Sequence, residues 1–232
     1  MKIFTIILYI SVSSTLFAQL PKSLITPLSK TSDFSNYKGS IYMNYNYEQS
    51  TVIHEKSRTY DAELKYNIHT DAIEFNSKGQ VYEIKKNVTT HVRIDDSYLY
   101  YCNFEDRYGT SRNGYYILVE LTDRYRIYKR LTTKIIKPQE RTATSVEVPG
   151  IVKINTKYYI EEDQVIMELP KNKKSMLALF SDKEDELKKY LKKEKIRLGK
   201  EEDLIRLVAR YNALKSSDSL SSKSLLSNSG NL

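Results

Sequence analysis

The chain has 232 residues, a formal net charge of +8, a single cysteine and no tryptophan. One cysteine cannot form an intramolecular disulfide, which excludes a disulfide-stabilised scaffold and leaves the hydrophobic core to hold the fold. Tyrosine is unusually frequent, at 20 residues, while glycine and proline are few. This composition favours a protein rich in β-sheet, with one domain or one domain plus a smaller appendage.

The N-terminal segment 1–18 has the organisation of a secretory signal peptide. Lys2 supplies the positive charge, residues 3–17 form an apolar stretch, and Ala18 is a small residue before the predicted cleavage point at Gln19. The apolar stretch is shorter than the roughly 20 residues of a membrane span and is interrupted by serines. No cysteine lies near the predicted cleavage point after Ala18, so the sequence offers no site for lipid attachment there. We therefore expect export, a soluble mature chain without a transmembrane span, and residence in the periplasm, with the extracellular space as the alternative.

Residues 19–38 are rich in Ser, Thr, Pro and Lys and predict a flexible lead-in. From residue 39 to 170 the pattern is typical of short antiparallel strands. Polar and apolar residues alternate over 63–68, a turn follows at 69–71, and the chain returns as a strand at 72–75. The other predicted strands are 41–47 (strand or extended segment), 51–54, 81–84, 90–94, 98–104, 115–121, 125–131, 158–160 and 165–169. Residues 103–114 are expected to form a polar loop and 134–150 a longer one.

The periodicity changes after Pro170, and residues 171–215 predict a helical pair. A short helix is expected over 173–180. Ser181 and Glu184 have the spacing of a capping box, with Ser181 as the N-cap of the next helix.

Gly199 separates that helix from the last one. The last helix has an apolar stripe at helical spacing, made of Leu204, Leu207, Val208, Tyr211 and Leu214. The Ser-rich segment 216–232 is predicted to be disordered. The fold class is therefore α+β: an antiparallel β-meander or half-barrel of about eight to eleven short strands, followed by two C-terminal amphipathic helices.

Two parts of the sequence, the meander at 64–75 and the C-terminal region, resemble a known group of proteins. The C-terminal part runs from Lys157-Tyr158-Tyr159-Ile160 through 173–180 to the capping box and the Glu-Glu-Asp-Leu-Ile helix. Together they resemble exported proteins of uncharacterised function that are common in Bacteroidota, and the leader ending in Phe-Ala-Gln is similar to theirs. The resemblance covers residues 39–214. It implies a periplasmic β-rich protein with a C-terminal helical pair and carries no catalytic assignment.

Motifs for catalysis or metal binding are absent from the sequence. The histidines His54, His69 and His91 are far apart and have no ligand partner at short spacing, so no metal site is predicted. Cys102 lies among tyrosines and apolar residues and is expected to be a buried, inert thiol. Neither a Gly-x-Ser-x-Gly elbow nor a glycine-rich phosphate loop occurs, and no carboxylate pair is set apart. We nominate no catalytic residue and expect no cofactor.

Tyrosine clusters and a basic helix have binding potential, although each also fits an ordinary role as sheet filler or solvated helix face. The tyrosines that strands could present to a partner are Tyr98, Tyr100, Tyr115 and Tyr158. The basic candidates are Lys188, Lys189, Lys192 and Lys193. Residues 171–215 hold fourteen basic and eight acidic side chains, a net charge of +6. Outside the cytoplasm, this charge favours an acidic protein, an anionic polysaccharide or a lipid surface over nucleic acid.

Three functions stay open at this point. The leading hypothesis is a non-enzymatic periplasmic protein that binds another protein or envelope component. One alternative is a hydrolase whose residues come from distant strands, and another is a membrane-surface protein that docks through the Lys-rich helix. A deep pocket with converging titratable groups would favour the hydrolase, whereas a shallow aromatic or basic patch would favour the binding protein.

Overall fold

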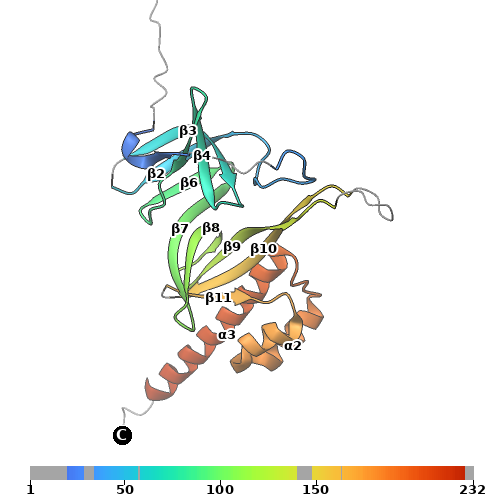
Figure 1. The fold of residues 1–232 in the computed structure, drawn as a ribbon. Coiled ribbons are helices and arrows are strands. Elements are labelled where there is room, and N and C mark those ends of the chain that lie inside the picture. The colour runs from blue at the N-terminus through green and yellow to red at the C-terminus, as the bar shows by residue number, and fades with distance from the viewer. Residues whose placement is uncertain (1–19, 29–33, 57, 140–147, 163, 228–232) are drawn as a thin grey trace, which may run out of the picture.

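The computed structural model describes residues 20–28, 34–56, 58–139, 148–162 and 164–227. Within these residues, eleven strands form one sheet and α-helices follow it near the C-terminus, which is the expected α+β architecture (Figure 1). The strands are β1 (Ile25–Pro27), β2 (Glu48–His54), β3 (Thr59–Asn67), β4 (Ala72–Ser77), β5 (Gln80–Ile84), β6 (Thr90–Ile94), β7 (Ser97–Asp106), β8 (Ser111–Leu121), β9 (Arg126–Ile136), β10 (Ile151–Glu162) and β11 (Val165–Leu169). The helices are α1 (Lys173–Leu179), α2 (Glu184–Lys193) and α3 (Glu201–Ser227).

Strand β7 is shared between two parts of the sheet. One edge of β7 pairs with β8 over residues 99–105. The opposite edge pairs first with β6, over 97–100, and then with β11, at Glu105 and Asp106. Because β8, β9, β10 and β11 also pair in that order, the five strands from β7 to β11 close into a ring. Strands β1, β5, β4, β3, β2 and β6 continue from β7 as the other part of the same sheet, which is drawn above the ring in Figure 1 and which we call the second sheet.

The meander of the second sheet follows the alternation in its sequence. In β3, Leu64 and Tyr66 are buried on one face, while Glu63 on the opposite face is exposed. The chain turns at Asp71, whose φ of 54° is in the left-handed region. It returns as β4, with Ile73 paired opposite Tyr66. The predicted pair of strands around this turn is confirmed.

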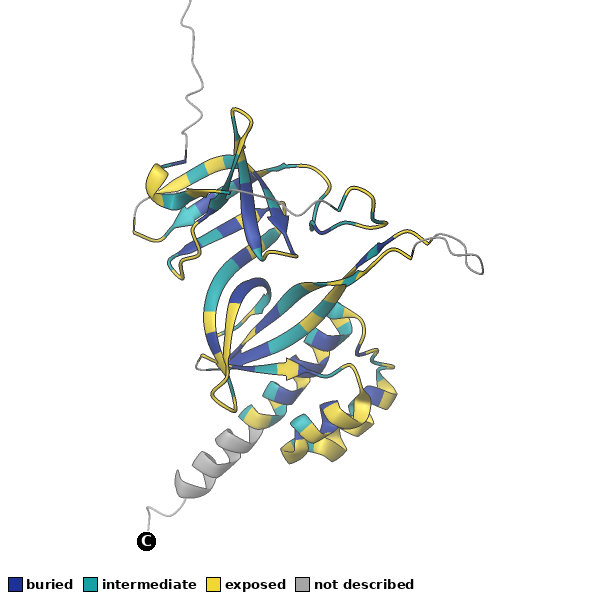
Figure 2. Ribbon diagram, viewed as in Figure 1, coloured by how far each residue is buried: buried dark blue, intermediate teal, exposed yellow. Residues whose placement is uncertain are grey.

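Buried apolar side chains form three clusters. Figure 2 colours the buried residues dark blue along the strands and helices. The second sheet has its own cluster, which includes Val52, Leu64 and Val92. A smaller cluster in the ring is largely aromatic, with members Phe104, Tyr116, Tyr128 and Ile166. The third cluster lies between the ring strands and the helices and includes Ile127, Ile160, Leu187, Leu204 and Leu207. Many tyrosines therefore serve as core residues, and the helices are held to the ring by an apolar layer.

The second sheet and the ring also meet at a polar junction, which we define as Asp71, Gly114 and Arg130. Oδ1 of Asp71 accepts a hydrogen bond from the Tyr66 hydroxyl at 2.7 Å, and Oδ2 accepts one from the Tyr115 backbone N–H at 3.2 Å. Nη2 of Arg130 lies 3.9 Å from Oδ2 of Asp71. Gly114 has a φ of 147°, and a Cβ at this position would lie 2.4 Å from Arg130 Nη2 and 2.7 Å from Asp71 Oδ2. Glycine is therefore the residue that fits here.

The first two helices begin differently from each other. Asn172 caps α1, because its Oδ1 accepts a hydrogen bond from the Ser175 backbone N–H at 3.2 Å. The capping box predicted at Ser181 and Glu184 is wrong: Ser181 lies in a 3-10 turn, Ser181–Lys183, and its side chain caps no helix. The tight turn that follows α1 places Ser181 inside a helical segment, where its hydroxyl cannot take the N-cap position.

The last helix matches its predicted stripe. Leu204, Leu207, Val208 and Tyr211 are buried, and the ring of Tyr211 stacks on Phe180 with centroids 4.2 Å apart. At its C-terminal end α3 differs from the expectation, because the helix continues to Ser227 through most of the segment predicted to be disordered. A helix that is already nucleated extends at little cost, and serine only weakly opposes it.

The N-terminal segment also differs from the expectation. The lead-in predicted to be flexible contains β1, which pairs with β5, and Leu20 is buried in the cluster of the second sheet. Residues 41–47 form no strand, although Ile41 is buried. The predicted signal peptide, 1–18, falls outside the described residues. None of the helices in the described part of the chain has the length and apolar character needed to cross a membrane.

Candidate binding cleft

A half-open cleft of about 550 Å³ lies between the β7–β8 turn, strand β11 and helix α1. Its walls come from two parts of the chain that are distant in sequence, the β7–β8 turn and the run from β10 through β11 to α1. The ring closure brings them together, because β11 meets the end of β7 at Glu105 and Asp106. We call this space the ring cleft.

The β7–β8 turn forms the first wall and is held by Asp106. Oδ1 of Asp106 accepts hydrogen bonds from the backbone N–H groups of Tyr108 and Thr110, at 2.9 and 3.0 Å. Oδ2 accepts two from the Arg112 guanidinium, at 3.0 and 2.8 Å. These bonds hold the pKa of Asp106 below its usual value, and the bond from the Thr110 backbone N–H has the largest effect. The turn is thereby fixed with its carboxylate ionised.

The same turn places an exposed aromatic and a cation at the rim. Tyr108 is 76% exposed, and the Arg107 guanidinium lies over its ring at 4.9 Å from the centroid. Nη2 of Arg107 also donates to the Tyr108 hydroxyl at 2.8 Å. Large exposed aromatics at the edge of a cavity are enriched where proteins meet partners.

Strands β10 and β11 form the second wall. Ile166 is buried and belongs to the ring cluster, and Tyr159 packs beside it with its ring 5.7 Å from that of Tyr116. Burial, and then the charge of Glu168, raise the pKa of Tyr159, so its hydroxyl stays neutral. Closer to solvent, Nζ of Lys157 lies 2.8 Å from Oε2 of Glu168.

Helix α1 forms the third wall with one of its faces. Ser175, Ala178 and Leu179 line the cleft, at the i, i+3, i+4 spacing that brings side chains to the same side of a helix. Met176 and Leu177 are buried on the other side, in the cluster that joins the helices to the ring. Burial of that face fixes the orientation of the cleft-facing one.

Strand β11 presents an open edge to the cleft. All five of its residues pair with β10, but only Val165 and Ile166 pair with β7. Beyond Ile166, the next residues Met167 and Glu168 line the cleft, and no strand in the described part of the chain neighbours them on that side. A strand paired on one side only carries backbone N–H and C=O groups available for another strand.

The charges of the cleft do not cancel. Arg107, Arg112 and Lys157 face two carboxylates, Asp106 and Glu168, which gives a net charge of +1. Arg112 pairs with Asp106, and Lys157 pairs with Glu168. Among the described residues, Arg107 makes no ion pair. The excess positive charge therefore belongs to Arg107 at the rim.

A second cavity of about 330 Å³ lies where the second sheet faces the ring. It is lined by the loop residues Met43 and Asn44 on one side and by Lys129 and Tyr158 on the other. Nδ2 of Asn44 donates to Asp95 at 2.9 Å, while its buried Oδ1 has no hydrogen-bond partner among the residues that the structure describes.

The four tyrosines predicted as binding candidates lie outside the ring cleft. Tyr98 is 37% exposed and faces the Arg93 guanidinium, and Tyr100 stacks on His91 with centroids 4.7 Å apart. Tyr158 is half-buried and donates to Oε2 of Glu201 at 3.0 Å. Tyr115 is only 2% exposed, so this candidate is corrected to a core residue: β8 turns its ring into the cluster of the second sheet.

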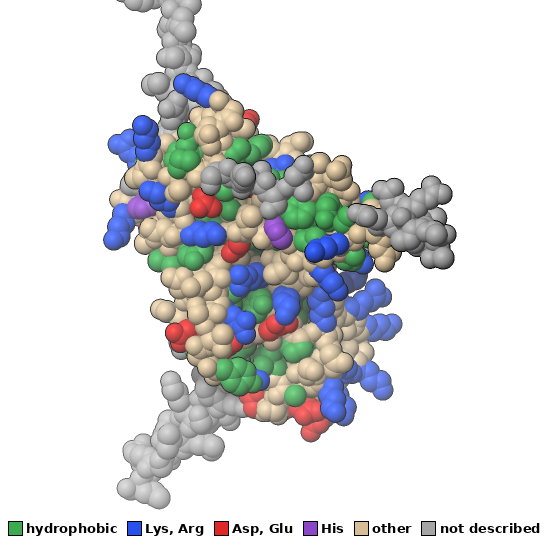
Figure 3. All heavy atoms as spheres, viewed as in Figure 1, with side chains coloured by type: hydrophobic (Ala, Val, Ile, Leu, Met, Phe, Trp, Pro, Cys, Tyr) green, Lys and Arg blue, Asp and Glu red, His purple; other side chains and the backbone are tan. Residues whose placement is uncertain are grey.

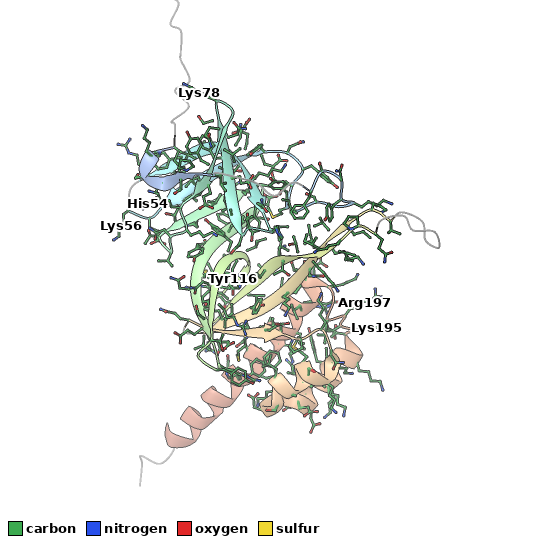
Figure 4. The ribbon with its side chains drawn as sticks, viewed as in Figure 1. His54, Lys56, Lys78, Tyr116, Lys195 and Arg197 are labelled. Atoms are coloured by element: carbon green, nitrogen blue, oxygen red, sulfur yellow. The ribbon has the colours of Figure 1, made fainter. Side chains whose placement is uncertain are left out.

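The four lysines lie together on α2. Lys188, Lys189, Lys192 and Lys193 are all exposed, while Leu187 and Leu191 face the apolar layer. The segment after α2 adds two more exposed basic side chains, Lys195 and Arg197, which Figure 4 labels at the right of the view, near the helices. Figure 3 shows basic side chains gathered at the lower right of this view, toward the helical end. They form a basic surface of the helices and do not line the ring cleft.

Metal-binding and nucleophilic chemistry have little support among the described residues. No group of three or more His, Cys, Asp and Glu side chains there could hold a metal ion. Burial, and then the charge of Glu161, raise the pKa of Cys102 to about 12, and its Sγ lies 3.7 Å from the Tyr100 carbonyl oxygen. The thiol is therefore neutral and a poor nucleophile near neutral pH.

Sequence reasoning missed the residues that shape the cleft. Arg107, Tyr108 and Arg112 fall in the segment treated as a polar loop. The combination of Asp106 with Gly109, which is typical of a tight turn, was a signal that this loop is ordered. Comparison of the chain with protein-family models, with curated proteins and with solved structures finds no match.

Proposed function

We propose that this protein is an exported, non-enzymatic binding protein of the cell envelope, and that the ring cleft receives part of another envelope component. The observation that carries the proposal is the cleft itself, with an apolar floor, a rim of fixed charges and an exposed Tyr108. Cavities of roughly 300–1,000 Å³ with a few placed polar groups are the usual form of ligand sites. The leader at 1–18 and the resemblance to exported proteins of Bacteroidota support the cellular location.

Binding suits the chemistry of the cleft better than hydrolysis does. A general acid or base works best with a pKa near the working pH. In the cleft, hydrogen bonds lower the pKa of Asp106, and burial raises the pKa of Tyr159. Arg112 is a permanent cation whose pKa is raised further by its hydrogen bond to Asp106. These groups keep a fixed charge state near neutral pH, as suits recognition.

The proposal is tested by photo-crosslinking from the cleft. A benzophenone amino acid replaces Tyr108, and another replaces Tyr45, which is 82% exposed but lies in the loop before β2. After irradiation with an envelope extract, we expect a defined adduct from position 108 and none from position 45. The same adduct should disappear when Ala178→Trp fills the cleft and persist with Ala209→Trp, an exposed alanine on α3. No adduct at 108, or one that survives Ala178→Trp, contradicts the proposal.

A second candidate function is docking to an anionic surface through α2. The specific observation in its favour is the group Lys188, Lys189, Lys192 and Lys193, which are exposed and make no ion pair among the described residues. Each basic residue near an anionic membrane contributes about 1 kcal/mol of attraction. Sedimentation with vesicles containing phosphatidylglycerol tests it. Binding that survives replacement of all four lysines by glutamate eliminates this function.

A further inference from the structure

We propose that the ring cleft binds an extended peptide segment of its partner, which adds as a strand to the open edge of β11 and places an acidic side chain beside Arg107. The inference rests on the proposed function, because it names the chemical class of what the cleft receives. It is carried by the open edge, the apolar wall of α1 and the excess charge at the rim, taken together.

The open edge selects for a polypeptide backbone. β11 is paired along its whole length with β10, but its pairing with β7 stops at Ile166. The β7–β8 turn then diverges from β11, and the space between them is the cleft. Met167 and Glu168 thus border the cleft at a place where the ring would accept one more strand. Strand addition to an open edge is a common mode of peptide recognition, in which main-chain hydrogen bonds supply much of the affinity.

The walls select for an apolar side chain next to that backbone. Leu179 and Ala178 on α1 and Met167 on β11 form the apolar surface that faces the edge. Side chains of a strand alternate between its two faces, so every second residue of a bound segment would lie toward the same wall. A segment with apolar residues at alternate positions fits this arrangement, and the volume of about 550 Å³ suits a few such residues.

The rim selects for negative charge. Arg112 and Lys157 are already held by Asp106 and Glu168, whereas among the described residues the Arg107 guanidinium contacts only the hydroxyl and ring of Tyr108. A carboxylate on the bound segment could accept a charge-assisted hydrogen bond from the Arg107 guanidinium. A basic segment would instead add a like charge to a site that already carries +1.

The test is a selection of peptides by the full-length protein. A phage-displayed library of random seven-residue peptides is selected on the immobilised protein and, in parallel, on the variants Ala178→Trp and Arg107→Glu. Two matched controls, Ala209→Trp and Arg58→Glu, make the same changes at exposed positions outside the cleft. Circular dichroism and the midpoint of urea unfolding establish that each variant is folded. The synthetic form of the most enriched peptide is then titrated with the protein by fluorescence anisotropy.

We expect enriched peptides with alternating apolar residues and an excess of Asp and Glu. Binding should weaken about tenfold or more in Ala178→Trp and in Arg107→Glu, and should be unchanged in both controls. Methylation of the peptide backbone nitrogens should weaken binding about tenfold at alternate positions and have little effect at the intervening ones, because only every second N–H faces the partner strand. This alternation is a readout that binding by side chains alone would not produce.

Several results would overturn the inference. A basic consensus contradicts the role of Arg107, and binding that is insensitive to N-methylation contradicts strand addition. A dimer that sediments as such and dissociates in Ala178→Trp would identify a second copy of the chain as the occupant. If no peptide is enriched while the crosslink from position 108 persists, the peptide inference fails and the binding function stands. If the crosslink is also missing, both fail.

Discussion

Replacement of Gly114 by alanine tests the polar junction between the second sheet and the ring. The φ of 147° at this position is a conformation that costs a non-glycine residue about 1–3 kcal/mol. A Cβ would also lie 2.4 Å from Nη2 of Arg130, so the guanidinium must move. It would then lose its hydrogen bonds to the Asn113 carbonyl, at 2.9 Å, and to the Tyr116 hydroxyl, at 3.2 Å.

The magnitude follows from these two effects. A hydrogen bond to a charged group contributes about 1.5–3 kcal/mol, and partial re-solvation of Arg130 recovers some of it. We expect Gly114→Ala to lower the free energy of unfolding by about 3–5 kcal/mol. Gly79→Ala is the matched control, because Gly79 also has a positive φ, 81°, but nothing lies within 4 Å of its Cβ position. The control should cost only about 1 kcal/mol, the price of backbone strain.

The assay is urea unfolding followed by circular dichroism, with the slope checked for two-state behaviour. The double variant Gly114→Ala, Arg130→Ala supplies a further check. Because Arg130→Ala already removes the crowded guanidinium, the two changes should cost less together than the sum of their separate effects. If Gly114→Ala and Gly79→Ala differ by less than about 1 kcal/mol, the steric role assigned to Arg130 is refuted.

The remaining predictions concern Cys102, the tyrosines and the helical layer. With its pKa raised from 9.0 to about 12, Cys102 should hold about a thousandth of the thiolate of an ordinary cysteine and react correspondingly slowly with iodoacetamide; rapid labelling of the native protein, measured by mass spectrometry, would contradict this. Burial raises the pKa of Tyr116 and Tyr158 to about 12, so the unfolded state loses protons near pH 10 that the native state retains. Stability should therefore be intact below pH 10 and fall as pH rises toward 12, together with the delayed appearance of tyrosinate absorbance; a flat unfolding midpoint across this range would be inconsistent with it. Leu207→Ala, at a fully buried position of α3, should cost about 2–5 kcal/mol in urea unfolding, whereas Ala209→Gly on the exposed face should cost about 1 kcal/mol; equal costs would show that α3 is not held by its apolar stripe.

Local patterns predicted the elements well where one face of an element is buried. The alternation around Leu64 and Tyr66 identified β3, and the stripe that contains Leu207 identified α3. The lead-in was misjudged because β1 is held by its pairing with β5 and by burial of Leu20, which are contacts with residues far along the chain. The prediction of a capping box was wrong for a related reason. Ser181 and Glu184 have the right spacing, but the chain is already in a 3-10 turn at Ser181.

The cleft could not be predicted from the sequence because it depends on ring closure. Nothing in residues 98–104 indicates that a single strand pairs with β6 and then with β11 along one edge. Without that closure, Tyr108 and Ala178 have no reason to lie near the same cavity. The tyrosine candidates illustrate the same difficulty. Tyr98 and Tyr115 look alike in sequence, yet one is partly exposed and the other is buried in the core.

The shared strand β7 has a consequence for how the molecule can be divided. A cut before β7, near residue 96, would separate the second sheet from the ring, but β6 would lose the strand that covers its edge. A cut after β7, near residue 108, would leave β7 with the second sheet and remove from it both β8 and β11. Either fragment would expose unpaired strand edges, which tend to associate with other chains. The described residues thus form one unit with no clean boundary, and truncated versions of the protein should aggregate.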